Sequence, residues 1–218
     1  MRTVFGKFVL SCAMIATACV SAISSASLIV ENGPATSLSF RIGGPNSQAE
    51  AVEWLQATSS DTKISALIGS VDGNPRSVDA YLVKIISGDV IASTTVTVGS
   101  YASLADFTLV DIFSGLTLKG DFYRLTLFNT DTSGDTNVRW SVGSSTTNTP
   151  KGIFLQAAYS QNSDTNVTNP YLSTFTDSTE LLGFQVTGIV PEPSSFALLG
   201  LGGIGLAVSA YRRRRAVV

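Results

Sequence analysis

The chain has 218 residues, contains no histidine, and has a formal net charge of −2. This small charge hides an asymmetry, because residues 27–190 carry eight Lys and Arg against fifteen Asp and Glu, whereas both ends are basic. An acidic body repels phosphate backbones, so we expect no nucleic-acid partner. Without imidazole, Ser-His-Asp and Cys-His catalysis are excluded, and the only cysteines, Cys12 and Cys19, precede the body. We therefore expect a non-catalytic protein that needs no cofactor.

Residues 1–26 have the three parts of a secretory signal peptide. A basic start with Arg2 and Lys7 leads into an apolar run, and the small residues that follow fit cleavage after Ala26. Cleavage after Ala22, lipid modification of Cys19 and a permanent membrane anchor are the alternatives. The run is short and lacks a stop-transfer flank, which favours the signal peptide. The predicted partners at this step are the Sec translocon and signal peptidase.

The other end has a motif, an apolar stretch and a basic cluster in that order. Pro191, Glu192 and Pro193 precede the apolar residues 194–211, and Arg212, Arg213, Arg214 and Arg215 follow them. A helix over 194–211 would be about 27 Å long at 1.5 Å per residue, close to the roughly 30 Å of a hydrocarbon core. The arginines predict a cytoplasmic C-terminus. The two prolines keep the strip before the span extended and accessible.

This order resembles the PEP-CTERM sorting domain over residues 190–215, a type of tail that also goes by the name of ice-binding protein C-terminal domain. The resemblance implies a Gram-negative bacterium that builds extracellular polysaccharide, and an exosortase-type protease-transpeptidase in its inner membrane. Pro191, Glu192 and Pro193 would be the recognition motif, with cleavage near them. The protein would be anchored transiently in the inner membrane and then reach the cell surface or the medium. A plain single-span anchor is the alternative.

Residues 27–189 predict an all-β domain. Apolar and polar side chains alternate with period 2, as in 38–42, 78–82, 123–127, 138–142 and 182–186, and turns rich in Gly, Asn and Asp separate the runs. Residues 47–57 fit either a short helix or a strand. Many short strands predict a single β-sandwich of jelly-roll type. The early strand 51–56 and the late strand 116–127 also resemble the sandwich domains that often accompany such tails.

A polar loop is a candidate calcium site. Asn129, Asp131, Ser133 and Asp135 place oxygen side chains at alternate positions around Gly134, as calcium loops do. Trp140 stands where an EF-hand loop requires a carboxylate, so the favoured interpretation is a hairpin loop without a metal.

Three aromatic side chains are candidate platforms for a sugar. Tyr159 and Tyr171 lie in polar, irregular stretches, and Trp54 lies on a mixed strand, so each could present its ring to a ligand. Trp140 alternates with Val138 and Val142 and is predicted to belong to the core.

Together these patterns predict an exported, non-catalytic surface or extracellular-matrix protein that is adhesive or associated with polysaccharide. The alternatives on the same sandwich are a carbohydrate-binding module and a glycoside hydrolase that uses two carboxylates. An open groove with two close carboxylates would favour the hydrolase, and a shallow aromatic platform would favour the binding module.

Overall fold

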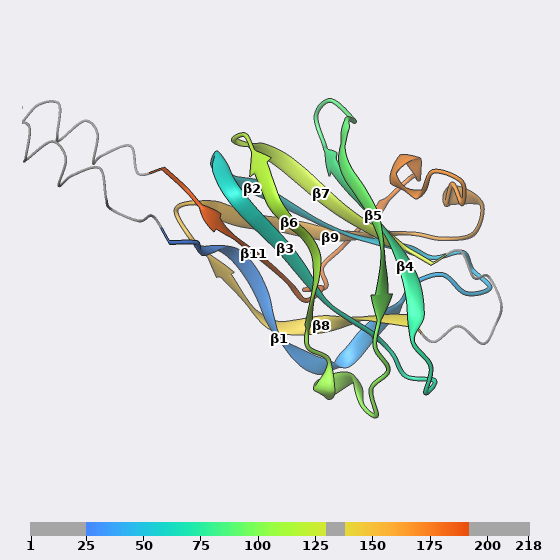
Figure 1. Cartoon of the computed structure of the whole chain (residues 1–218). Coiled ribbons are helices and arrows are strands. Elements are labelled where there is room, and N and C mark those ends of the chain that lie inside the picture. Colours follow the sequence, from blue (N-terminus) through green and yellow to red (C-terminus); the bar gives the residue numbers. More distant parts are fainter. Residues whose placement is uncertain (1–24, 130–137, 192–218) are drawn as a thin grey trace, which may run out of the picture.

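The computed structural model describes residues 25–129 and 138–191, which form two antiparallel sheets (Figure 1). The strands of the described residues are β1 (Ser27–Arg41), β2 (Ala49–Gln56), β3 (Ser59–Ser70), β4 (Arg76–Lys84), β5 (Val90–Val98), β6 (Leu109–Leu118), β7 (Asp121–Phe128), β8 (Val138–Asn148), β9 (Gly152–Ser160), β10 (Thr176–Ser178) and β11 (Phe184–Ile189). Short 3-10 turns cover Leu104–Asp106, Asn162–Asp164 and Pro170–Leu172. The predicted all-β sandwich is confirmed, and residues 49–56 of the ambiguous segment form a strand.

The strand order is that of a jelly roll with added strands. One sheet has the order β11-β1-β8-β3-β6 and the other β10-β9-β2-β7-β4-β5. From β1 to β8 the chain changes sheet at every connection except the β4–β5 hairpin. This places β1-β8-β3-β6 opposite β2-β7-β4-β5, which is the jelly-roll arrangement. The added strands β9 and β10 widen the six-stranded sheet beyond β2.

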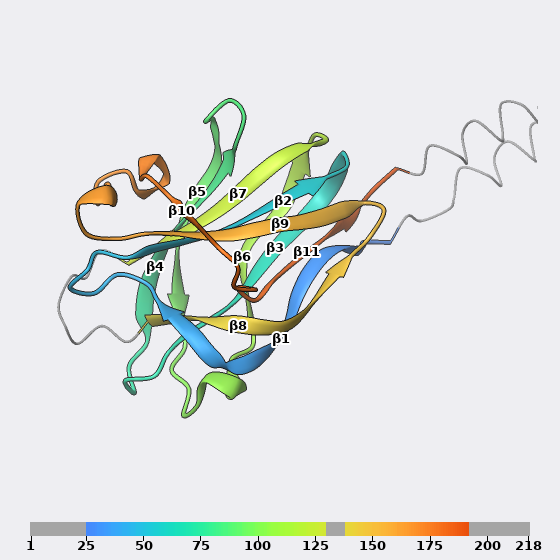
Figure 2. The same ribbon diagram turned by 180° about the vertical axis from the view of Figure 1, so that it is seen from behind.

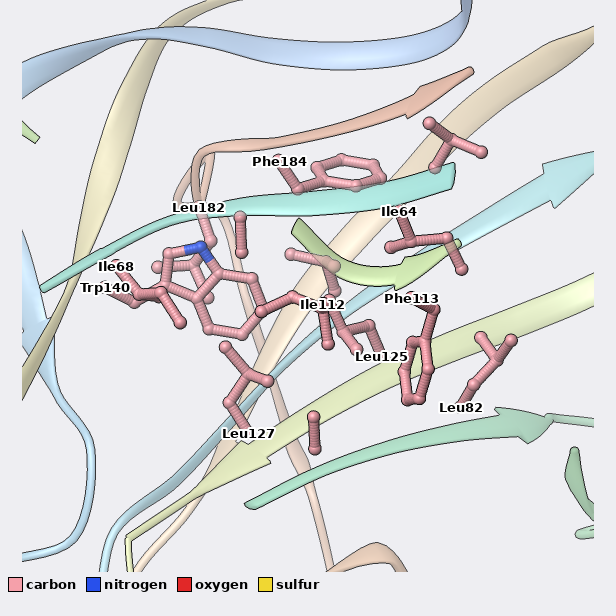
Figure 3. Close-up of a cluster of buried hydrophobic side chains, with 14 of the residues drawn as sticks. Ile64, Ile68, Leu82, Ile112, Phe113, Leu125, Leu127, Trp140, Leu182 and Phe184 are labelled. Carbon is pink, nitrogen blue, oxygen red and sulfur yellow. The ribbon is translucent and has the colours of Figure 1, made fainter. Parts of the chain in front are cut away.

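The core lies between the sheets because the alternating apolar side chains of each sheet point at those of the other. Figure 3 shows Ile64, Trp140 and Phe184 of the five-stranded sheet facing Leu125 and Leu127 of the other. All five side chains are fully buried. Each such side chain contributes about 1.5–3 kcal/mol through removal of its apolar surface from water. The cohesion of the domain therefore comes from the two inner faces that the period-2 pattern predicted.

The last strand, β11, is held inside the five-stranded sheet. It pairs with β1 from Ser27 to Asn32 and with β3 from Ser60 to Ala66. Strand β8 pairs directly with β3 only over Ile68–Ser70, so β11 supplies the pairing that β3 needs over the rest of its length.

The outer face of the six-stranded sheet is partly covered by the segment 161–178, which is orange in Figure 2. The rings of Tyr171 and Tyr81 lie 5.1 Å apart, and the Arg124 guanidinium lies 4.6 Å from the centre of the Phe175 ring. Asp177 accepts a hydrogen bond of 2.8 Å from Gln156. These contacts hold the segment against β4, β7 and β9.

Four turns lie at the end of the sandwich where β1 begins and β11 ends, and the β4–β5 turn projects apart from the other three (Figure 1). They are the connections 57–58, 85–89, 119–120 and 149–151, and we call this surface, together with Ser27 and Ile189, the tail end. Hydrogen bonds tie it together, since Ala57 donates to the Lys151 carbonyl and Lys151 Nζ donates to Ser27 Oγ at 3.0 Å.

Candidate functional site

A pocket of about 560 Å³ opens on the outer face of the five-stranded sheet. Strands β1, β3 and β8 form its floor, and the β5–β6 connection with the start of β6 forms one side. On β1, Val30 and Asn32 are buried, so the intervening Glu31 and Gly33 lie on the outer face. The pocket is lined by Glu31, Asn32, Gly33, Pro34, Ala35, Leu67, Phe107, Thr108, Leu109, Ser145 and Thr147.

The pocket has an apolar part and a polar part. Leu67, Phe107 and Leu109 supply apolar surface, and Leu109 is 37% exposed. The Phe107 ring is held in place by Tyr101, whose ring centre is 5.0 Å away. A ligand with a hydrocarbon face and a hydroxyl rim would find partners on both sides.

Hydrogen bonds fix the polar side chains of this pocket. Glu31 Oε1 accepts a bond of 2.9 Å from Gln185 Nε2. Asn32 donates to the Leu182 carbonyl at 3.2 Å and accepts from the Thr146 hydroxyl at 2.7 Å. Ser145 Oγ donates to the Gly33 carbonyl at 2.9 Å. Glu31 is the only carboxylate among the described residues that line the pocket.

None of these residues was a candidate from the sequence. They come from four separate strands and one connection, which only the sheet order β1-β8-β3-β6 brings together. Their spacing along the chain has no pattern that could have indicated a common site.

Trp54 is not the surface platform that the sequence predicted. Its side chain is 0% exposed, because β2 turns Val52 and Trp54 toward the opposite sheet. The ring lies 5.6 Å from that of Phe184, and the indole N–H donates to Gln56 Oε1 at 2.8 Å. Trp140 is fully buried as predicted, with its N–H donating to the Gly183 carbonyl at 2.8 Å.

The two tyrosine candidates do not form a common surface. Tyr159 pairs with Glu50 on the face of the sheet that carries Val52, and it is half-buried. Tyr171 contacts Tyr81, which lies on the opposite face because Ala80 and Leu82 point into the core. The contact of Tyr171 with Tyr81 thus holds the segment 161–178 against the sheet.

The polar loop is described only at its first residue. Asn129 is buried, and its amide donates to the Ser77 carbonyl at 2.8 Å. Asp131, Ser133 and Asp135 lie outside the described residues. Within residues 25–129 and 138–191, no three carboxylates are close enough together to hold a metal ion.

A buried carboxyl group that the sequence did not reveal lies on β2. Glu50 is 2% exposed, and burial raises its pKa to about 8, although a hydrogen bond of 2.5 Å from Gln48 Nε2 acts in the other direction. It does not line the pocket.

The pKa of Asp72 is shifted in the opposite direction. Hydrogen bonds from Ser70, the Asn74 N–H and Arg76 lower it to about 2.

The predicted sorting motif follows β11 directly. Strand β11 ends at Ile189, Val190 is half-buried, and Pro191 is exposed. Glu192, Pro193, the predicted span 194–211 and Arg212 to Arg215 lie outside the described residues, as do residues 1–24. Ala26, the predicted cleavage site, is exposed just before β1. None of the helical turns in the part of the chain that is described has the length and apolar character to cross a membrane.

Comparison with known families identifies the segment after β11. Residues 190–215 match the model of the PEP-CTERM protein-sorting motif, which confirms the predicted resemblance over the same residues. No curated protein matches the chain. The motif indicates an exported protein that is anchored transiently in the membrane and processed by an exosortase-type membrane enzyme.

Proposed function

We propose that this chain is a non-catalytic surface or extracellular-matrix protein, which an exosortase-type transpeptidase sorts through residues 190–215. The observation that carries the proposal is the position of the motif match, which begins at residue 190, one residue after β11 ends. Pro191, which follows the completed sandwich, is exposed. An extended strip beyond a folded domain is accessible to a processing enzyme. The export route would be the Sec translocon, with signal peptidase cutting after Ala26.

The folded domain would associate with polysaccharide through the pocket of the five-stranded sheet. A sugar ring has C–H faces that pack on apolar side chains and hydroxyl groups that bond to polar ones. Leu67 and Leu109 offer the first kind of partner, and Glu31, Ser145 and Thr147 offer the second. This mixed lining supports an adhesive or carbohydrate-binding role.

The same lining argues against the glycoside hydrolase alternative. Hydrolysis of a glycosidic bond by the usual mechanisms requires two carboxyl groups, about 5–10 Å apart, on either side of that bond. Glu31 is the only carboxylate among the described residues that line the pocket. The pocket therefore favours binding over hydrolysis.

The sorting proposal is tested by mass spectrometry of both ends of the protein in its own host. We expect a mature N-terminus at Ser27 and a C-terminus within or near Pro191, Glu192 and Pro193. The triple variant Pro191→Ala, Glu192→Ala, Pro193→Ala should keep Arg212 to Arg215 and stay in the membrane fraction. The control variant Pro45→Ala, an exposed proline far from the motif, should be processed normally. A wild-type protein that keeps its arginines would instead be a plain anchored protein.

The polysaccharide proposal is tested by calorimetric binding of the host's own extracellular polysaccharide to the released protein. Ser145→Trp should fill the pocket from an exposed strand position and weaken binding at least tenfold. Ser93→Trp makes the same change at an exposed position of β5 in the other sheet and should leave binding unchanged. Equal affinities of the wild type and Ser145→Trp would rule out this pocket as the binding site.

A further inference from the structure

The four lysines of the domain lie in the tail end or next to it. Lys119 and Lys151 are in its turns, Lys84 ends β4, and Lys63 on β3 pairs with Thr187 near the end of β11. Four aspartates, Asp61, Asp89, Asp111 and Asp121, accompany them there, and two of these form ion pairs, Asp111 with Lys63 at 3.3 Å and Asp121 with Lys84 at 3.1 Å. The other described residues carry four arginines against nine carboxylates, so the tail end is balanced in charge and the rest is acidic. The tail end is therefore the one part of an acidic domain that an anionic surface would not repel.

Exposed apolar side chains accompany these lysines. Ile86, in the β4–β5 turn, is 75% exposed and lies two residues after Lys84. Ile153, at the start of β9, is 46% exposed and lies two residues after Lys151. Strands β4 and β9 are separated by β2 and β7, so these two lysine–isoleucine pairs are roughly 15 Å apart at 4.8 Å per strand.

The sorting segment leaves the domain at the same end and limits the distance between the domain and a membrane. Pro191 is three Cα-to-Cα steps from Ser194, where the predicted span begins. At no more than about 3.6 Å each, these three steps reach about 11 Å. The headgroup region on one side of a bilayer is roughly 5–8 Å thick. A domain on so short a tether has its tail end at the headgroups for as long as the segment spans the membrane.

We infer that the tail end is a lipid-facing surface that seats the domain on an anionic bilayer while the sorting segment is inserted. Lysine side chains bind lipid phosphates with their ammonium groups and lay their methylene stems along the apolar boundary. Ile86 and Ile153 would enter that boundary beside them. The two lysine–isoleucine pairs and the emerging chain give three contacts, which define the orientation of the domain. This holds the strip at Pro191 close to the membrane, where the sorting enzyme is embedded.

The inference rests on the proposed membrane insertion of residues 194–211, and one experiment tests both separately. The chain 27–218, which keeps the sorting segment and contains no cysteine, is reconstituted into nanodiscs of phosphatidylcholine with or without phosphatidylglycerol. A nitroxide label is placed at Ser87→Cys in the tail end or, as a control, at the exposed Ser163→Cys beyond β9. Accessibility of the label to oxygen, which enters lipid, is compared with accessibility to a water-soluble nickel complex.

When phosphatidylglycerol is present, we expect the label at position 87 to become more accessible to oxygen and less accessible to the nickel complex. The label at position 163 should stay in water. Replacing Lys63, Lys84, Lys119 and Lys151 by glutamine should abolish the change, whereas Arg41→Gln with Arg139→Gln should not. High salt should reduce the change in the unaltered chain, which gives a readout without any lysine substitution.

A chain that enters nanodiscs of both compositions but leaves the label at position 87 in water would overturn the lipid-facing surface alone. A change that is equal with and without phosphatidylglycerol would also overturn it. A chain that enters neither kind of nanodisc would contradict the membrane insertion on which the inference rests.

Discussion

Glu50 places a carboxyl group where the sandwich offers it almost no water. It lies on the face of β2 that carries Val52 and Trp54, and it pairs with Leu127 on β7. Burial disfavours the charged form and raises the pKa of Glu50 from 4.5 to about 8. The folded domain therefore keeps a proton that the unfolded chain has already lost at neutral pH.

This difference predicts a pH dependence of stability that Glu50→Gln should remove. The folded pKa is above the unfolded one, so the full stability is present below pH 4.5 and is lost as the pH rises through about 8. At 1.36 kcal/mol per pH unit, the loss by pH 9 is at most about 5 kcal/mol. Urea unfolding at pH 5 and pH 9 should show a larger stabilising effect of Glu50→Gln at pH 9.

The exposed carboxyl of Asp106 provides the control for this measurement. Asp106→Asn should change the free energy of unfolding by a similar small amount at both pH values. An effect of Glu50→Gln that is the same at pH 5 and pH 9 would show that Glu50 ionises normally in the folded domain.

At the scale of elements, β1 and β8 approach each other closely beside the pocket. A Cβ atom added to Gly143 on β8 would lie 2.7 Å from the carbonyl carbon of Asn32 and 2.9 Å from the amide nitrogen of Gly33. Both contacts are with backbone atoms, so β1 itself would have to move. The glycine is thus required by the packing of two paired strands.

Gly143→Ala should therefore destabilise the domain by about 1–3 kcal/mol, the usual cost of overpacking. It should also weaken ligand binding in the pocket, because Asn32 and Gly33 line it. Gly120→Ala is the matched control, since its added Cβ would meet no atom nearer than 3.5 Å. Thermal unfolding of the two variants measures the difference, and equal melting temperatures would contradict the close approach.

The strands were predictable from sequence to the extent that each has one face on the core. The alternation of Leu125 and Leu127 with Arg124 and Thr126 marked β7 correctly, because the two sheets bury one face of each strand. The same rule applied to Trp54 would have placed it beside Val52 in the core. The alternation is not visible in β2, where polar and apolar residues occur on both faces. The segment 161–178 and the neighbouring strands bury the outer face of β2 as well.

The pocket and the insertion of β11 could not be predicted, for a different reason. Leu67 and Ser145 meet at the pocket only through the order of β3 and β8 in the sheet, which is set by pairings between distant segments. Local patterns determine which face of a strand is buried but not which strand is its neighbour. The sorting motif was recognisable because all of its information lies within residues 190–215.

For the whole molecule, the sorting segment is attached so that its removal need not disturb the fold. Strand β11 ends at Ile189 and its side chains Phe184 and Val186 are fully buried, whereas Pro191 is exposed. A cut at the motif leaves every strand pairing intact. A cut only a few residues earlier would remove the strand that lies between β1 and β3.

Two truncations of the chain should therefore behave in opposite ways. A chain that ends at Pro191 should unfold at the same temperature as the uncleaved protein, because no described contact is lost. A chain that ends at Gly183 should lose the burial of Phe184 and Val186, about 1.5–3 kcal/mol each, together with the β11 pairings. That loss is comparable to the whole stability of a domain, so we expect no cooperative transition by circular dichroism. A stable fold of the chain that ends at Gly183 would mean that the sandwich does not need its last strand. A lower melting temperature of the chain that ends at Pro191 would mean that release by the sorting enzyme destabilises the domain.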